Sequence, residues 1–190
     1  MGVRAGWFLL IAGCGSIAAP RPVDTLTATD FEDETLMPAA EAAECFSRFL
    51  ARFQEPRLQP TRMRGAEAYR FLWIDSEHVV CCVRIERQPE GSARVHYQQL
   101  DAHGDAVVVQ RTTTVPASDW REWRAQLEAS RFWQTDARKG ALLLCGGSDW
   151  ILEGADFERR HLVWLQSPDD PAVRACWSRL LEMAGVEQDL

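Results

Sequence analysis

The stretch that decides the fold runs from Ala68 to Leu100 and has the sequence AYRFLWIDSEHVVCCVRIERQPEGSARVHYQQL. In its segments 68–74, 78–87 and 94–100 large apolar residues recur at every second position, as in Tyr69, Phe71 and Trp73, and short runs with Asp, Ser, Pro and Gly separate the segments. Alternation with a period of two is typical of strands that bury one face. Because the connections are short, we expect successive strands to pair antiparallel, as in a meander.

Outside this stretch the chain alternates between strand and helix patterns. Four further segments have strand character: 106–114, 141–145, 150–153 and 160–166. Three segments repeat apolar residues at steps of three and four, which indicates amphipathic helices: Pro38 to about Gln54, Ser118 to Ala129 with Ser118 as N-cap, and Pro171 to Ala184 after Asp170. The patterns predict an α+β fold, an antiparallel meander of about six to seven strands with three helices packed on one face. The other face would be wet and carry Arg84, Glu86, His96 and Gln98.

Composition predicts one globular domain, residues 38–190. The chain of 190 residues is 46% hydrophobic and 9% aromatic, which is enough for one packed core. Residues 14–37 hold two prolines and an acidic run with little apolar periodicity, so we expect a flexible tether there.

Residues 1–13 have the order of a secretory signal. Arg4 precedes a short apolar run, which ends in Ile11-Ala12-Gly13-Cys14. This tetrapeptide resembles the lipobox of bacterial lipoproteins at all four places. The resemblance implies cleavage after Gly13 and a diacylglyceryl group on the Cys14 thiol. Since the apolar run is too short to cross a bilayer, lipid on Cys14 would be the anchor.

The same resemblance implies a place in the cell envelope. In proteobacterial lipoproteins an Asp after the modified cysteine favours the inner membrane, and Gly15 stands here instead. We therefore expect the outer membrane, facing the periplasm, with membrane lipid as a partner through acylated Cys14 and an envelope protein as a possible second partner. Nucleic acid is not expected as a partner, because the net charge is −7 and Lys139 is the single lysine.

Five cysteines remain beside the lipidation site: Cys45, Cys81, Cys82, Cys145 and Cys176. In an oxidising compartment they are disulfide candidates, with at most two bonds from five thiols. Neighbours in a strand point to opposite faces, so Cys81 and Cys82 would have different partners. The preferred pattern joins one of them to Cys145 and joins Cys45 to Cys176. Buried reduced thiols are the alternative.

No familiar catalytic or metal motif occurs in the chain, so the sequence predicts neither a metal site nor a cofactor. One local segment suggests chemistry: Cys145 as a nucleophile, His161 as its base, and Glu153 nearby. A plainer interpretation is a turn between strands in which Glu153 pairs with Arg160 or His161 across a hairpin.

Seven tryptophans lie in the predicted domain, and packing between helices and sheet explains most of them. Trp133 and Trp164 are the two whose exposure would indicate a ligand surface. The function that the sequence favours is a lipid-anchored envelope protein that binds or scaffolds and is not an enzyme. The alternatives are an envelope hydrolase or transferase that uses Cys145 and His161, and a toxin-neutralising or assembly-partner lipoprotein.

Overall fold

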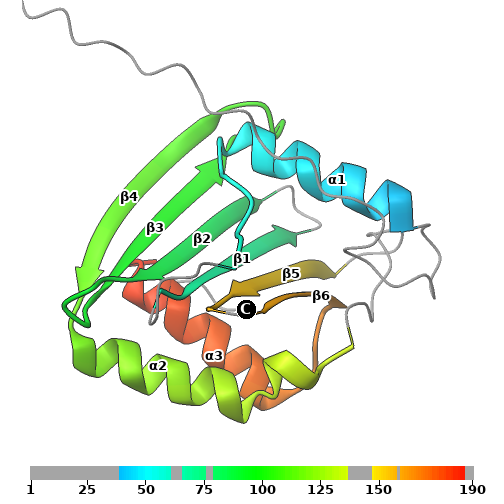
Figure 1. Ribbon diagram of the computed structural model, residues 1–190. Helices are drawn as coiled ribbons and strands as arrows, with labels where there is room; N and C mark the ends of the chain where they lie inside the picture. Colours follow the sequence, from blue (N-terminus) through cyan, green and yellow to red (C-terminus); the bar gives the residue numbers. More distant parts are fainter. Residues whose placement is uncertain (1–38, 61–65, 76–78, 137–146, 158, 187–190) are drawn as a thin grey trace, which may run out of the picture.

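The computed structural model describes residues 39–60, 66–75, 79–136, 147–157 and 159–186 (Figure 1). It forms six antiparallel strands in one open sheet and three α-helices, so the predicted α+β class is confirmed. In chain order the elements are α1 (Ala39–Arg52), β1 (Ala68–Asp75), β2 (Val80–Arg87), β3 (Ala93–Leu100), β4 (Val107–Val115), α2 (Ala117–Ala129), the one-turn helix η2 (Phe132–Gln134), β5 (Ser148–Ala155), β6 (Arg160–Gln166) and α3 (Pro171–Met183).

The sheet has the strand order β4-β3-β2-β1-β5-β6, and every neighbouring pair is antiparallel. The first four strands form the expected meander. The chain then returns through α2, and the β5–β6 hairpin joins the sheet on the other side of β1 (Figure 1). As a result β1 lies in the interior of the sheet. The predicted strand at 141–145 lies outside the described residues.

The expectation that all three helices share one face is wrong, because the sheet lies between α1 and the pair α2–α3 (Figure 1). Tyr69, Phe71 and Trp73 of β1 face the α2–α3 layer, whereas Leu72 and Ile74 face α1. The cause is that β1 is apolar on both sides. Each face therefore needs its own cover to remove it from water.

The two core layers differ in their side chains. The α2–α3 layer is rich in aromatic rings, and the Trp123 indole N–H donates to the Cys176 carbonyl at 3.0 Å, which joins α2 to α3. The α1 layer is smaller, and Phe46, Leu50 and Phe53 supply most of its helical side. Two separate helical surfaces thus hold one sheet.

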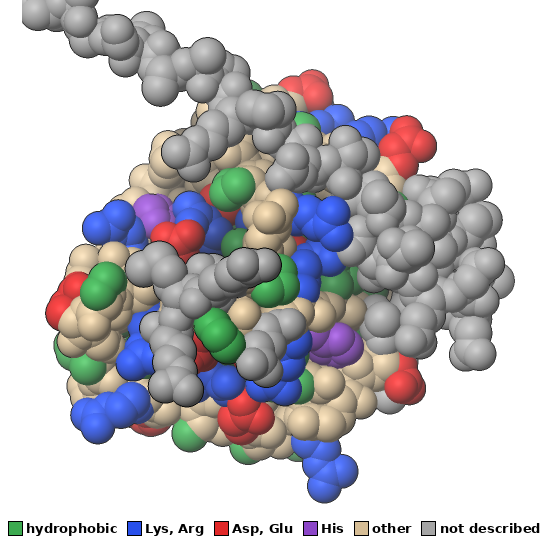
Figure 2. Space-filling view, in the orientation of Figure 1, with side chains coloured by type: hydrophobic (Ala, Val, Ile, Leu, Met, Phe, Trp, Pro, Cys, Tyr) green, Lys and Arg blue, Asp and Glu red, His purple; other side chains and the backbone are tan. Residues whose placement is uncertain are grey.

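The predicted wet side chains lie on the α1 side, outside the apolar cluster that α1 covers. Arg84, Glu86 and His96 are half-buried there, and Gln98 is buried. Basic and acidic side chains are intermixed over the middle of the view in Figure 2, between the positions of α1 and α2. The expectation of a solvent-exposed sheet face is therefore met only on the part of the α1 side that α1 does not cover.

One of the two predicted helix N-caps is confirmed and the other is wrong. Asp170 caps α3 as expected: its carboxylate accepts from Ala172 N at 2.8 Å and from Val173 N at 3.3 Å, and Pro171 follows it. Ser118 does not cap α2. The cap is Pro116, and the Ser118 hydroxyl donates to Asp119 Oδ1 at 2.9 Å instead.

Candidate functional site

The structure does not bring the predicted catalytic residues together. Glu153 pairs with Leu162 across the β5–β6 hairpin and shares its face with the α1 layer. His161 pairs with Gly154, one residue further along the strand, and therefore points to the α2–α3 side. Cys145 lies outside the described residues. Since a sheet separates the imidazole from the carboxylate, Glu153 does not orient His161.

Glu153 is instead part of a buried ion network, and its predicted pairing with Arg160 is confirmed. The Arg160 Nε donates to Glu153 Oε1 at 2.8 Å, and Arg70 Nη1 donates to Glu153 Oε2, also at 2.8 Å. Glu153 and Arg70 have no exposed surface. Both carboxylate oxygens therefore accept charge-assisted hydrogen bonds from guanidinium groups.

The network continues toward the open part of the α1 face. Glu55, which follows α1, lies 3.2 Å from Arg70 Nη2 and 2.7 Å from Arg84 Nε. Arg84 also pairs with Glu86. Three arginines and three glutamates therefore form one charge-balanced chain of contacts across β6, β5, β1 and β2. Balanced pairing is the condition under which such charges tolerate burial.

His96 extends this polar row to the sheet edge. It lies opposite Arg84 on β2 and opposite Thr112 on β4, and its Nδ1 is 3.1 Å from the Thr112 hydroxyl. Burial and the Arg84 guanidinium both lower the pKa of His96. The imidazole is therefore held in its neutral form more strongly than a free histidine.

His161 has a structural environment. Its Nε2 donates to the Thr135 carbonyl at 2.8 Å, and its ring contacts Phe132 edge-on at a centroid distance of 5.1 Å. Trp133 lies beside it, with the Arg159 guanidinium 3.9 Å above the indole ring. These contacts fix η2 against β6 and explain the half-buried position of Trp133 by packing.

Trp164 is buried, and its indole N–H donates to Asp149 Oδ1 at 3.0 Å. It is therefore a core residue. Of the two tryptophans singled out by the sequence, Trp164 is buried and Trp133 is half-buried, with the Arg159 guanidinium over its ring.

The described cysteines are buried thiols. Cys45, Cys81, Cys82 and Cys176 are all free. The predicted Cys45–Cys176 disulfide is wrong, because α1 and α3 lie on opposite faces of the sheet. Cys81 and Cys82 do point to opposite faces, as predicted. The partner proposed for one of them, Cys145, lies outside the described residues.

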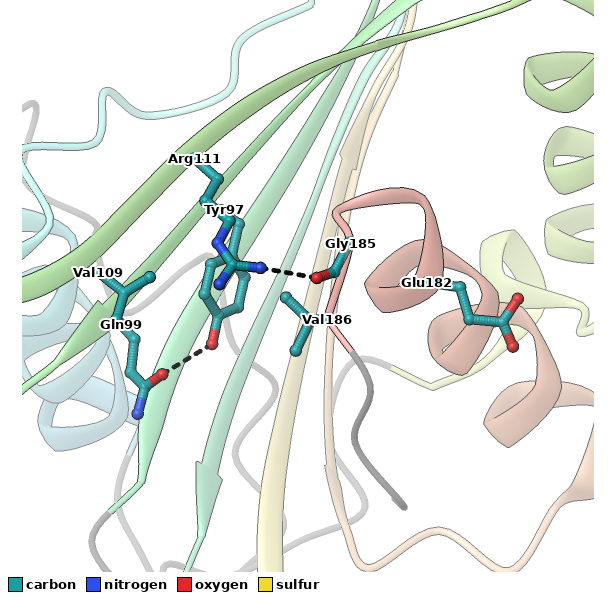
Figure 3. Close-up of a pocket in the computed structure, with 7 residues that line it drawn as sticks. All are labelled: Tyr97, Gln99, Val109, Arg111, Glu182, Gly185 and Val186. Atoms are coloured by element: carbon teal, nitrogen blue, oxygen red, sulfur yellow. Dashed lines mark hydrogen bonds between the residues drawn. The ribbon is translucent and has the colours of Figure 1, made fainter.

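A pocket of about 530 Å³ lies where α3 ends over β3 and β4 (Figure 3). Seven residues line it: Tyr97, Gln99, Val109, Arg111, Glu182, Gly185 and Val186. It opens on the α2–α3 side, next to the outer edge of the sheet. No local sequence pattern predicts this site, because its walls come from three separate elements. The glycine after the last helix, at φ +73°, is the one local signal for the end of α3.

Hydrogen bonds hold the polar groups of the pocket in place. The Tyr97 hydroxyl donates to Gln99 Oε1 at 3.0 Å, and Arg111 Nη1 donates to the Gly185 carbonyl at 2.7 Å. Burial, together with the nearby Cys81 thiol, raises the pKa of Tyr97 above its ordinary value. The phenol therefore stays neutral, and Arg111 brings a positive charge to the pocket mouth.

The one carboxylate among the described lining residues is already paired. Glu182 accepts from Arg179 Nη1 at 2.9 Å, and in Figure 3 it points away from Arg111 and Gln99. Arg111 thus has no acidic partner within the pocket lining. Together with the Gln99 amide, it gives the pocket two donors beside the apolar side chains of Val109 and Val186.

Among the described residues, no group of three His, Cys, Asp or Glu side chains could hold a metal ion. In the same parts of the chain, no helix has both the length and the apolarity of a membrane span. Comparison with protein-family models finds no match for this chain, and comparison with curated proteins finds none either.

Proposed function

We propose that this chain is a lipid-anchored protein of the bacterial cell envelope whose globular domain acts by binding another molecule. The lipid anchor is proposed from the tetrapeptide Ile11-Ala12-Gly13-Cys14, which follows Arg4 and a short apolar run. Two or three acyl chains on Cys14 would hold the protein stably, because each buried methylene contributes about 0.8 kcal/mol.

A binding role is supported by the pocket beside β4. It combines a fixed cation, Arg111, with amide and apolar groups from Gln99, Val109 and Val186. Such a mixture is typical of sites that orient a ligand. The catalytic alternative lacks comparable support, since Glu153 and His161 are on opposite faces of the sheet.

The anchor is tested by Cys14→Ser in the full chain, expressed in a proteobacterial host. We expect uncleaved precursor and loss of partitioning into the detergent phase, whereas Cys45→Ser, which removes a buried thiol, keeps both cleavage and partitioning. Mass spectrometry of the N-terminal peptide measures the lipid directly. If Cys14→Ser is cleaved and fractionates like wild type, the anchor proposal is wrong.

The membrane is tested separately with Gly15→Asp. We propose the outer membrane, facing the periplasm, because the inner-membrane signal is not present at position 15. This substitution is then expected to move the protein from the outer-membrane fraction to the inner-membrane fraction, which sucrose-gradient fractionation measures. Wild-type protein in the inner-membrane fraction would contradict the proposal.

A further inference from the structure

The described residues leave the outer edge of β4 open along most of its length. β4 and β6 are the two edge strands. Only Val115 of the nine β4 residues is buried, whereas four of the seven β6 residues are. No described strand pairs with the outer side of β4, so its outward N–H and C=O groups have no strand partner in the described parts of the chain.

Open edges of this kind are normally protected against pairing. β4 has two such devices, the charge of Arg111 and a bulge where Val108 has no partner between the Gln99–Val109 and Leu100–Val107 pairs. From Val109 to Val115 the strand is regular, β-branched in five of seven residues, and without proline, lysine or acidic residues. These residue types favour a strand that accepts a neighbour.

A second copy of this chain is not the neighbour that β4 favours. Arg111 is the middle residue of Val107–Val115. In a two-fold antiparallel pairing along the whole strand it therefore lies opposite Arg111 of the other copy. Like charges directly opposite each other destabilise a strand pair. A strand with an acidic residue opposite Arg111 gains from the same geometry.

The pocket adds a second requirement. Val109 and Arg111 point to the same side of the sheet, where Val186 and the Tyr97 ring also line the pocket (Figure 3). On an added antiparallel strand, the residue two positions after the acidic one lies opposite Val109. An apolar side chain there would cover Val109 and enter the pocket mouth.

We propose that β4 accepts an extended peptide segment of a partner protein as an additional antiparallel strand, with an acidic residue paired to Arg111 and an apolar residue two positions later over Val109. Main-chain hydrogen bonds supply the affinity, and the Arg111 charge and the pocket supply the selectivity. This deepens the proposed function and rests on its binding role.

The experiment uses the full chain in detergent and two blocked, fluorescent peptides, TTTETVT and TTTKTVT, which differ only in the residue placed opposite Arg111. Fluorescence anisotropy is expected to give about tenfold tighter binding of the Glu peptide. Arg111→Glu is expected to invert the preference. Arg121→Glu, the matched change on the exposed surface of α2, is expected to leave it unchanged.

Amide hydrogen exchange on the wild-type protein tests the pairing without any substitution. Alternate amides of Gln110 to Thr114 are expected to gain protection when the Glu peptide is added. The proposal is overturned if the two peptides bind equally, or if folded Arg111→Glu keeps the wild-type preference. It is also overturned if β4 gains no new protection, or if sedimentation shows a dimer of this chain whose interface is β4. Each of these results leaves the Cys14 measurement unaffected, so failure of the peptide site is distinguishable from failure of the anchor.

Discussion

Arg70 is a guanidinium with no exposure to solvent, held by carboxylates from two different parts of the chain. Glu153 on β5 and Glu55 after α1 both contact it, and its Nη2 also donates to the Pro56 carbonyl. Burying one charge without the others would leave an uncompensated ion in the core. The network therefore binds the segment after α1 to the middle of the sheet.

We predict that Glu153→Gln lowers the free energy of unfolding by about 3–5 kcal/mol, because it leaves Arg70 and Arg160 with one carboxylate fewer in a buried site. Urea unfolding followed by tryptophan fluorescence measures the change. The matched variant Glu128→Gln breaks an exposed i,i+4 pair with Arg124 and is expected to cost less than about 0.5 kcal/mol. Equal effects of the two variants would contradict the role of the network.

Sequence distance explains which of these contacts could be predicted. Glu153 and Arg160 are seven positions apart in one hairpin, so the alternation of the strands is enough to pair them. Arg70 and Glu153 are 83 positions apart and meet only because β5 joins the sheet beside β1. The predicted meander does not contain that crossover. The local sequence pattern therefore could not predict the contact between Arg70 and Glu153 or the pocket beside β4.

At the scale of elements, α3 is the helix whose sequence and structure agree in most detail. Asp170, Pro171 and Gly185 mark its start and end as expected. We predict that Asp170→Ala costs about 1 kcal/mol, since it removes the acceptor of two backbone N–H groups. Asp169→Ala is the control at an exposed neighbour, expected within about 0.5 kcal/mol of wild type. Similar losses from both variants in thermal unfolding would exclude the cap as the cause.

The position of α1 shows the limit of periodicity. Its apolar stripe predicts that one side of the helix is buried, but not which face of the sheet receives it. The signal that both faces are covered lies in the strands: Phe71-Leu72-Trp73-Ile74 and Leu162-Val163-Trp164-Leu165 are continuous apolar runs, without alternation. Runs of this kind are typical of strands packed on both sides. The alternating residues of β2 and β3 led to the one-face expectation instead.

At the scale of the whole molecule, both core layers contain thiols that resist ionisation. Burial raises the pKa of Cys81 and of Cys176 to about 12 from 9.0, and it raises the pKa of Cys82 well above that ordinary value. Cys81 and Cys176 belong to the α2–α3 layer, and Cys82 belongs to the α1 layer. Ionisation of these thiols at alkaline pH is therefore expected to destabilise the core layers on both faces of the sheet.

We predict that the free energy of unfolding falls as pH rises above about 9. A thiol whose pKa is higher in the folded state stabilises the protein fully below pH 9.0, and this contribution is lost as pH rises toward about 12. The expected slope is about 1 kcal/mol per pH unit per thiol between about pH 9 and 10. The two tyrosines add to this slope as pH approaches 10.0, because burial raises the folded-state pKa of both above that ordinary value, and the chain has only one lysine. Urea unfolding of the reduced protein at several pH values measures this slope. The Cys81→Ala variant is expected to have a shallower slope than wild type. Equal slopes in the two proteins would show that Cys81 ionises as easily in the folded chain as in the unfolded one.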